Sequence, residues 1–129
     1  MLRVVCRAKL HRLRVTGANL DYMGSIGIDG GLLAAAGILP YEMVQIANRA
    51  NGVLWRTYVV PEAEGSGRVV LNGPPARHFQ PGDEVIVLSL AWVTAEEAEG
   101  WVPTLVFVDE ANRLTEVRRG ETAGPEARR

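Results

Sequence analysis

Residues 2–16, LRVVCRAKLHRLRVT, largely alternate apolar side chains with polar or charged ones. At the two-residue period of a β-strand, one face of this stretch is apolar and the other carries cations. The apolar face consists of Leu2, Val4, Cys6, Ala8 and Leu10, and the opposite face of Val5, Arg7, Lys9 and His11. The stretch therefore predicts a strand that packs its back against a core and presents a positively charged front.

The rest of the chain predicts further short strands separated by glycine and proline turns. Strands are expected at 20–28, 43–46, 53–60, 68–71, 84–93, 102–108 and 113–117, with turns at 17–19 and 72–75. Asn51-Gly52 is a strong hairpin signal. Only two short helices are expected, one over 32–36 between an Asp29 cap and a Gly37 stop, and one after the Thr94 capping box. This pattern favours a small closed β-barrel over a layered α/β fold.

The composition is typical of one soluble globular domain, with 129 residues of which 47% are hydrophobic and 22% charged. A domain of this size has little room for a cavity of its own, so we expect a substrate pocket to involve a neighbouring subunit. No stretch has the length of a signal peptide's apolar run or of a membrane span, which predicts a cytoplasmic protein with no membrane partner. Residues 1–118 are expected to form the barrel and 119–129 a disordered tail.

The distribution of charge and of metal-ligating side chains limits the classes of ligand that this protein is expected to bind. The net charge is −1, although residues 1–24 carry five cations against only Asp21. Because no aromatic side chains are interleaved with these cations, a nucleic-acid partner is not expected, and a small anionic ligand or carboxylates elsewhere in the protein are favoured. The single cysteine, Cys6, excludes an internal disulfide. His11 and His78 lie far apart in sequence without companion ligands, so we predict no metal site.

The dipeptide Gly24-Ser25 permits one unusual reaction. Where the backbone is strained, the Ser25 hydroxyl can attack the Gly24 carbonyl and convert the peptide bond into an ester, and glycine tolerates such strain. Elimination across the ester leaves dehydroalanine, and hydration with loss of ammonia leaves a pyruvoyl group at the new N-terminus. Taken alone, such a dipeptide is more often a simple turn between strands. The surrounding residues are therefore needed to distinguish a turn from a self-cleavage site.

From Arg3 to about Val117 the chain resembles the pyruvoyl-dependent aspartate 1-decarboxylases. The resemblance is carried by AKLHR (8–12), VT (15–16), LDYMGS (20–25), AAAGIL (34–39), NG (51–52), TY (57–58), GSG (65–67), LNG (71–73) and PGD (81–83). It implies a small six-stranded double-psi β-barrel, a homotetramer with active sites between subunits, and self-cleavage into residues 1–24 and 25–129. The product would be β-alanine, the precursor of pantothenate.

The resemblance also implies roles for individual residues. Ser25 would supply a covalently bound pyruvoyl group that forms a Schiff base with the amino-acid substrate, so that neither pyridoxal phosphate nor a metal is needed. Tyr58 would donate the proton, Lys9 would hold a carboxylate, and His11 would take part in proton transfers. Gly24 and Thr57 would serve self-processing. The implied substrate-binding residues are Lys9, Tyr22, Arg56, Thr57, Asn72, Gly73, Pro74 and Pro75.

Two regions depart from the family pattern. Leu54 stands where the family usually has an arginine that clamps a carboxylate, and Arg56, on the same face of the expected strand, is the candidate replacement. Pro74 and Pro75 replace small residues whose backbone N–H groups face the substrate, and proline has no N–H. Three functions therefore stay open: aspartate decarboxylation, decarboxylation of a different amino acid, and a barrel that never cleaves. The need for a maturation partner stays open as well.

Overall fold

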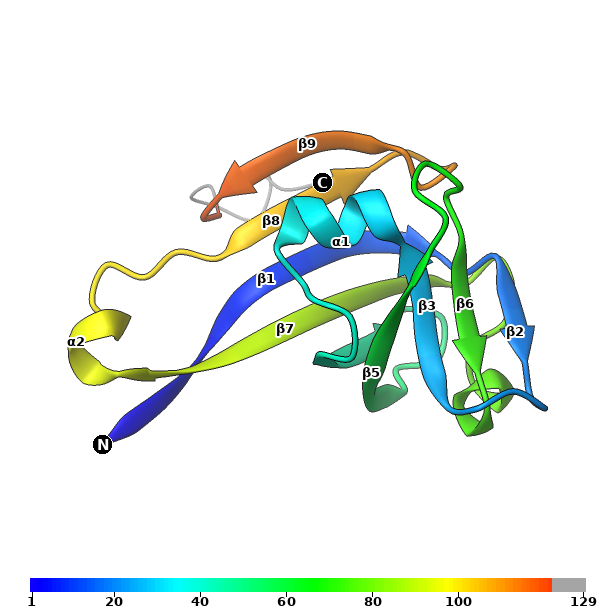
Figure 1. Cartoon of the computed structure of the whole chain (residues 1–129), viewed down its shortest axis with the longest axis horizontal. Coiled ribbons are helices and arrows are strands. Elements are labelled where there is room, and N and C mark those ends of the chain that lie inside the picture. The colour runs from blue at the N-terminus through cyan, green and yellow to red at the C-terminus, as the bar shows by residue number, and fades with distance from the viewer. Residues whose placement is uncertain (122–129) are drawn as a thin grey trace.

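The strands of the computed structural model, which describes residues 1–121, join in one sheet (Figure 1). Their order across the sheet is β2-β6-β3-β5-β4-β7-β1-β8-β9. The strands are β1 (Leu2–Arg14), β2 (Gly17–Asn19), β3 (Ser25–Asp29), β4 (Met43–Asn48), β5 (Leu54–Glu62), β6 (Val69–Asn72), β7 (Glu84–Thr94), β8 (Thr104–Val108) and β9 (Leu114–Arg119). The helices are α1 (Gly30–Ala36), α2 (Ala95–Ala98) and the 3-10 helix η1 (Pro74–Arg77).

The sheet curls so that its β2 edge returns to the end of β1. Only residues 15 and 16 separate β1 from β2 in the chain, although the two strands lie far apart in the order of the sheet. Thr16 makes the junction: its N–H donates to the Val69 carbonyl at 2.8 Å, and its hydroxyl accepts from the Val69 N–H at 2.9 Å. The side chain of Asn112 also bridges the backbone of Arg14 to the Gly67 carbonyl.

This curled sheet confirms the predicted mainly β, single-domain fold and is consistent with a double-psi β-barrel. Nine strands occur among residues 1–121, where the barrel itself was expected to contain six. The chain between β9 and residue 121 is described, and the rest of the expected tail, residues 122–129, lies outside the described residues.

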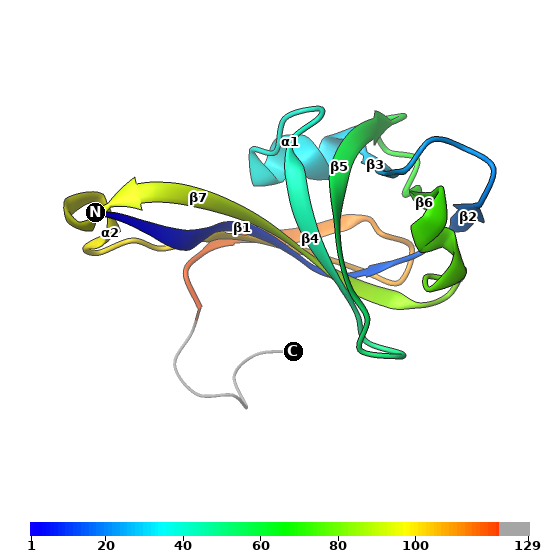
Figure 2. The same ribbon diagram turned by 90° about the horizontal axis from the view of Figure 1, so that it is seen from below.

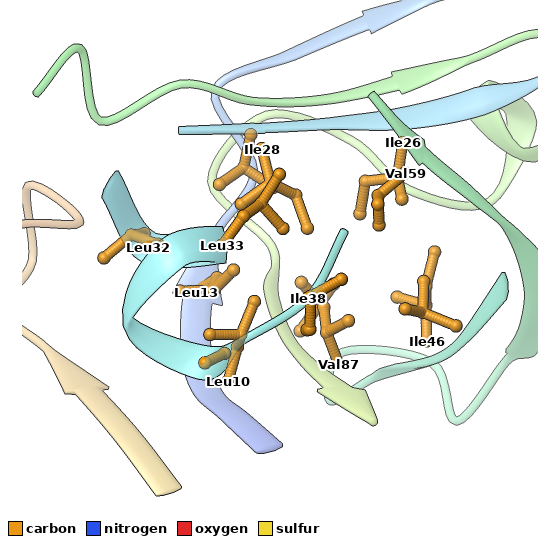
Figure 3. Close-up of a cluster of buried hydrophobic side chains, with 14 of the residues drawn as sticks. Leu10, Leu13, Ile26, Ile28, Leu32, Leu33, Ile38, Ile46, Val59 and Val87 are labelled. Atoms are coloured by element: carbon orange, nitrogen blue, oxygen red, sulfur yellow. The ribbon is translucent and has the colours of Figure 1, made fainter. Parts of the chain in front are cut away.

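The core fills the inside of the curl (Figure 3). Leucine, isoleucine and valine side chains meet there from β1, β3, β4, β5 and β7, and α1 contributes Leu32 and Leu33. Each of these side chains, when removed from water, stabilises the fold by about 1.5–3 kcal/mol. The rigid core thereby fixes the register of the strands that carry the candidate site residues.

β1 follows the predicted alternation only in its middle. Ala8 and Leu10 are fully buried, but Leu2 and Val4 on the same predicted face are 58% and 48% exposed. Figure 2 shows the cause, since the first part of β1 and the last part of β7 run together away from the other strands toward α2. Beyond Leu10 a register shift, with Arg12 at φ 58°, changes the phase of the alternation so that Leu13 also enters the core.

The locally signalled elements form where the sequence predicts them. Asp29 caps α1 by accepting a hydrogen bond from the Gly31 N–H, and Gly37 ends the helix at φ 71°. Thr94 and Glu97 make the reciprocal capping box of α2. Asn51-Gly52 lies in the connection between the antiparallel strands β4 and β5. These signals act over a few residues, which explains why the sequence alone reveals them.

Two predicted elements near the candidate site are corrected. Residues 17–19 were expected to turn, but they form β2, which pairs in parallel with β6. The expected strand 20–28 begins only at Ser25, because residues 20–24 form a turn and bend that connect β2 to β3. The long-range pairing to β6 stabilises an extended backbone at a glycine-containing sequence that by itself favours a turn.

Candidate active site

Ser25 and Asn72 lie together on neighbouring strands, 47 residues apart in sequence. The Asn72 side-chain amide donates a hydrogen bond to the Ser25 Oγ at 3.0 Å, and that hydroxyl donates to the Met23 carbonyl at 3.3 Å. Ser25 is 1% exposed and Asn72 is 6% exposed. The arrangement therefore holds a nucleophilic oxygen next to an amide donor in a site closed to bulk water.

Gly24 and Gly73 pack backbone against backbone beside this pair. A Cβ placed on Gly73 would lie 2.7 Å from the Gly24 Cα and 2.9 Å from the Gly24 nitrogen. Gly73 also has φ 77° and ψ −149°, a conformation almost restricted to glycine. Gly24, at which the sequence analysis expects strain, is not among the described residues with positive φ. The conformation that requires glycine therefore occurs at Gly73.

Tyr58 lies on the same side of the sheet as Ser25. Ile26 pairs in parallel with Val59, and both side chains are fully buried in the core. Because side chains alternate along a strand, the preceding residues Ser25 and Tyr58 both point to the opposite side. One strand spacing, about 4.8 Å, separates their backbones. The phenol of Tyr58 is half-buried there, which leaves it accessible to a small molecule above the sheet.

Thr57 lies on the other side of β5. Its side chain is 8% exposed, and the residue pairs with the buried Val44 of β4. The parallel pairing of β3 with β5 begins at Ile26 and Val59, two residues after Thr57 on β5. Thr57 and Tyr58 therefore contact different surroundings, with Thr57 buried beside β4 and Tyr58 on the more accessible side.

Pro74 and Pro75 follow Gly73 directly and begin η1. A Cβ placed on Gly24 would lie 3.8 Å from the Pro74 Cδ, so the proline ring packs beside the predicted cleavage bond. Pro75 is buried, and its carbonyl accepts from the His78 N–H at 2.9 Å. The turn predicted at 72–75 thus continues as a short helix whose first turn offers no N–H from either proline.

Lys9 and His11 lie in a different part of the fold. In the order of the curled sheet, β4 and β7 lie between β1 and β5. Both side chains line a cavity of about 210 Å³ with Arg12, Arg49, Leu105, Phe107 and Glu121, and neither Ser25 nor Tyr58 lines it. Burial and the cations Lys9 and Arg12 lower the pKa of His11 below its ordinary 6.5. The imidazole is therefore largely neutral at pH 7 and able to accept a proton.

Arg56 and Tyr22 are the two remaining predicted site residues. Arg56 is exposed on the same face of β5 as Tyr58 and as Leu54, which is 64% exposed. It lines a cavity of about 160 Å³ with Met43, Val44, Gln45, Leu90 and Trp92. The predicted sharing of one face by Leu54 and Arg56 is confirmed. Tyr22 is 55% exposed in the connection before Gly24, and its carbonyl borders Gly73.

One neighbour of Tyr58 has no signal in the sequence. The ring of Tyr41 lies 5.9 Å from the ring of Tyr58, with the two planes inclined by 37°. Tyr41 follows Pro40, a position that predicts only the end of α1. Its approach depends on the hydrogen bonds between residues 41–42 and β5, which no local pattern reveals.

The described residues contain no group of three or more His, Cys, Asp or Glu side chains arranged to hold a metal ion. Within residues 1–121, none of the helices has both the length and the apolar character that a membrane crossing requires.

The sequence was compared with protein-family profiles and with curated proteins, and both comparisons find aspartate decarboxylases. A family profile described as aspartate decarboxylase matches residues 1–115. Aspartate 1-decarboxylase of Pelotomaculum thermopropionicum is 49% identical over 125 residues, which cover 97% of this chain and 95% of the relative. Aspartate 1-decarboxylase 2 of Gloeobacter violaceus is 52% identical over 125 residues, 96% of this chain and 100% of the relative. Aspartate 1-decarboxylase of Salinibacter ruber is 54% identical over 117 residues, 91% and 80% of the two chains.

Proposed function

The chain belongs to the aspartate decarboxylase family, and from this premise we propose that it cleaves itself between Gly24 and Ser25 and then converts L-aspartate to β-alanine and CO2. The activity is that of a carboxy-lyase, and we assign it to the cytoplasm and to pantothenate synthesis. The observation that carries the proposal is the buried hydrogen bond from Asn72 to the Ser25 hydroxyl, next to the close contact of Gly24 with Gly73.

In the self-cleavage, the Ser25 Oγ forms a bond to the Gly24 carbonyl carbon, and the peptide C–N bond breaks to leave an ester and a free amine. Negative charge develops on the Gly24 carbonyl oxygen, and the Thr57 hydroxyl on the neighbouring strand donates to it. Asn72 orients the Ser25 hydroxyl through its hydrogen bond. Loss of the residue 25 Cα proton then breaks the Cβ–O bond, which releases the Gly24 carboxylate and leaves dehydroalanine. One water molecule adds to its imine tautomer and ammonia leaves, so that residue 25 becomes a pyruvoyl group.

The residues around position 25 fit such a group, because the site is enclosed, has an amide donor, and is bordered by a glycine that leaves no room for a Cβ. Once formed, the group would accept electron density from a bound amino acid as CO2 departs. Tyr58, on the accessible side of the sheet, holds the proton that the substrate carbon then receives. Asn72 and Gly73 border the substrate, and Tyr22, Pro74 and Pro75 enclose it.

We propose that the working site is shared between the subunits of a homotetramer. Lys9 and His11 line a separate cavity within one chain, so a neighbouring copy is needed to bring them to Ser25. Met43, Leu54 and Trp92 are 53%, 64% and 73% exposed, an apolar surface that a second subunit would cover. In the assembled site Lys9 binds a substrate carboxylate, and the neutral His11 accepts or returns a proton.

The deciding experiment is a denaturing mass measurement of the purified protein. Self-cleavage splits the 129-residue chain into pieces of 24 and 105 residues, the larger without a free amine. The Ser25→Ala variant should remain whole while keeping its fold. Cleavage that persists in Ser25→Ala contradicts the role of Ser25, and a wild-type chain that stays whole supports the non-catalytic barrel. Incubation with and without a cell extract tests for a maturation partner.

A second candidate function is decarboxylation of a different amino acid, and the residues at positions 54, 74 and 75 favour it. Leu54 cannot bind a carboxylate, and the two prolines remove two backbone donors beside Gly73. Arg56 lies on the same exposed face and is the residue able to replace the lost cation. Steady-state rates for L-aspartate and a panel of amino acids separate the two functions. Exclusive use of aspartate, lost in Arg56→Ala, supports the first, whereas faster turnover of a less acidic amino acid supports the second.

A further inference from the structure

Tyr41 has a backbone conformation that a side chain disfavours. Its φ is 70°, in the left-handed region, and it is one of three described non-glycine residues with positive φ. A bulky aromatic residue adopts this conformation only when its surroundings hold it there. Two hydrogen bonds to β5 hold it: the Tyr41 N–H donates to the Val59 carbonyl at 2.8 Å, and the Val59 N–H donates to the Glu42 carbonyl at 3.0 Å.

The Glu42 side chain secures the same segment to β1 and β7. Its carboxylate accepts from the Arg7 guanidinium at 2.6 Å and from the hydroxyl of Ser89, and from the Leu39 N–H at 3.2 Å. Arg7 also donates to the Gly37 carbonyl at 3.0 Å and to the Ser89 Oγ at 2.8 Å. Ser89 is fully buried. The segment between α1 and β4 is therefore held at both ends by charged hydrogen bonds.

The result of this anchoring is a contact with Tyr58. The Tyr41 side chain is 75% exposed, so burial does not account for its position. Its ring nevertheless lies 5.9 Å from the ring of Tyr58, at an inclination of 37°, within the range of favourable aromatic pairs.

We propose that Tyr41 is a positioning residue that fixes the ring of Tyr58 for proton transfer, and that the Arg7, Glu42 and Ser89 side chains hold Tyr41 in place. The inference rests on the proposed function of Tyr58 as proton donor. Tyr58 is half-buried on an open side of the sheet, so its ring needs a neighbour to restrict its torsions. Proton transfer requires the phenol oxygen within hydrogen-bond reach of the reacting carbon, and small displacements reduce the rate steeply.

The experiment compares Tyr41→Phe with Tyr41→Gly. Phenylalanine keeps the ring, and glycine removes it while adopting φ 70° without strain. We expect Tyr41→Phe to keep the wild-type kcat, and Tyr41→Gly to lose about tenfold in kcat with an unchanged KM. Self-cleavage, subunit number and resistance to denaturant should not fall in either variant. In a Tyr58→Phe background, Tyr41→Gly should cause no further loss, because the two residues act through one proton transfer.

Three results would overturn the inference. These are a wild-type kcat in Tyr41→Gly, an equal loss in Tyr41→Phe, and a full additional loss in the Tyr58→Phe background. A drop in subunit number would assign Tyr41 to a subunit contact and overturn it as well. If the wild-type protein shows neither cleavage nor turnover, the proposed function itself is refuted, and the role of Tyr41 with it. If the wild-type protein is active but one of the results above is found, only the role of Tyr41 is refuted.

Discussion

Replacement of Gly73 by alanine tests the backbone contact on which self-cleavage depends. The new Cβ would lie 2.7 Å from the Gly24 Cα, and Gly24 or Gly73 must move by about 0.7 Å before the pair reaches an ordinary contact of 3.4 Å. Both neighbouring atoms, the Gly24 Cα and nitrogen, belong to the backbone, so no flexible side chain can yield instead. The displacement falls on the carbonyl that the Ser25 hydroxyl must attack.

The magnitude follows from two contributions. Placing alanine at φ 77° and ψ −149° costs about 1–3 kcal/mol of folding stability, and relief of the contact adds about 1 kcal/mol or more. Because small domains have about 5–15 kcal/mol of stability, the variant should still fold. A displacement approaching 1 Å at reacting atoms reduces a rate by up to about 100-fold, so we expect self-cleavage to slow by about 10- to 100-fold.

Gly52→Ala is the matched control. Gly52 has φ 75°, but nothing lies within 4 Å of the position its Cβ would take. The control should therefore lose only about 1–2 kcal/mol in denaturant unfolding and keep the wild-type cleavage rate. Cleavage is followed by denaturing mass spectrometry over time. If Gly73→Ala cleaves as fast as Gly52→Ala, the contact between Gly73 and Gly24 does not position the scissile bond.

Four further outcomes are expected. Asn72→Ala should slow cleavage with little change in unfolding, because it removes the donor to the Ser25 hydroxyl; an unchanged cleavage rate contradicts this. Asp29→Ala leaves three N–H groups of nearby glycines without their acceptor and should lower denaturant stability by about 2–4 kcal/mol. Although burial opposes ionisation of Glu42, hydrogen bonds from Ser89 and Arg7 outweigh it and hold its pKa below the ordinary 4.5. Its contribution to stability is therefore complete above pH 4.5 and is lost as pH falls through the folded-state pKa, so Glu42→Gln should show a smaller loss of unfolding free energy between pH 6 and about pH 3. Finally, if subunits share the site, inactive Ser25→Ala and Lys9→Ala chains should regain partial decarboxylation when refolded together, whereas a site complete within one chain would stay inactive.

The sequence predicted some residues of the candidate site, but it did not predict all of the contacts that those residues make. Gly24 and Ser25 were expected to serve self-cleavage and Asn72 and Gly73 to bind the substrate, and the structure places the two pairs in contact. Lys9 and His11 were expected in the same site but line a separate cavity of the single chain. Tyr41 was not expected at all, because an unfavourable backbone conformation has no local signature.

By itself the sequence determined the features that depend on near neighbours. Asp29 and Thr94 cap helices by binding backbone N–H groups two or three residues away, and Gly37 ends a helix through its own backbone conformation. Asn51-Gly52 likewise connects two strands that are adjacent in the sequence. Short stretches of sequence are therefore enough to predict these features.

Only the tertiary structure decided which strands meet and on which side each residue lies. Sheet register decides that Ser25 pairs with Asn72 and that residues 17–19 form a strand. Leu2 and Val4 are exposed because their part of β1 extends beyond the core. A strand's alternation is the same whether its face meets a core or extends beyond it, and a shift in register moves side chains to the other face. Packing between segments distant in the chain settles both, because it alone fixes which of the compatible pairings buries the core.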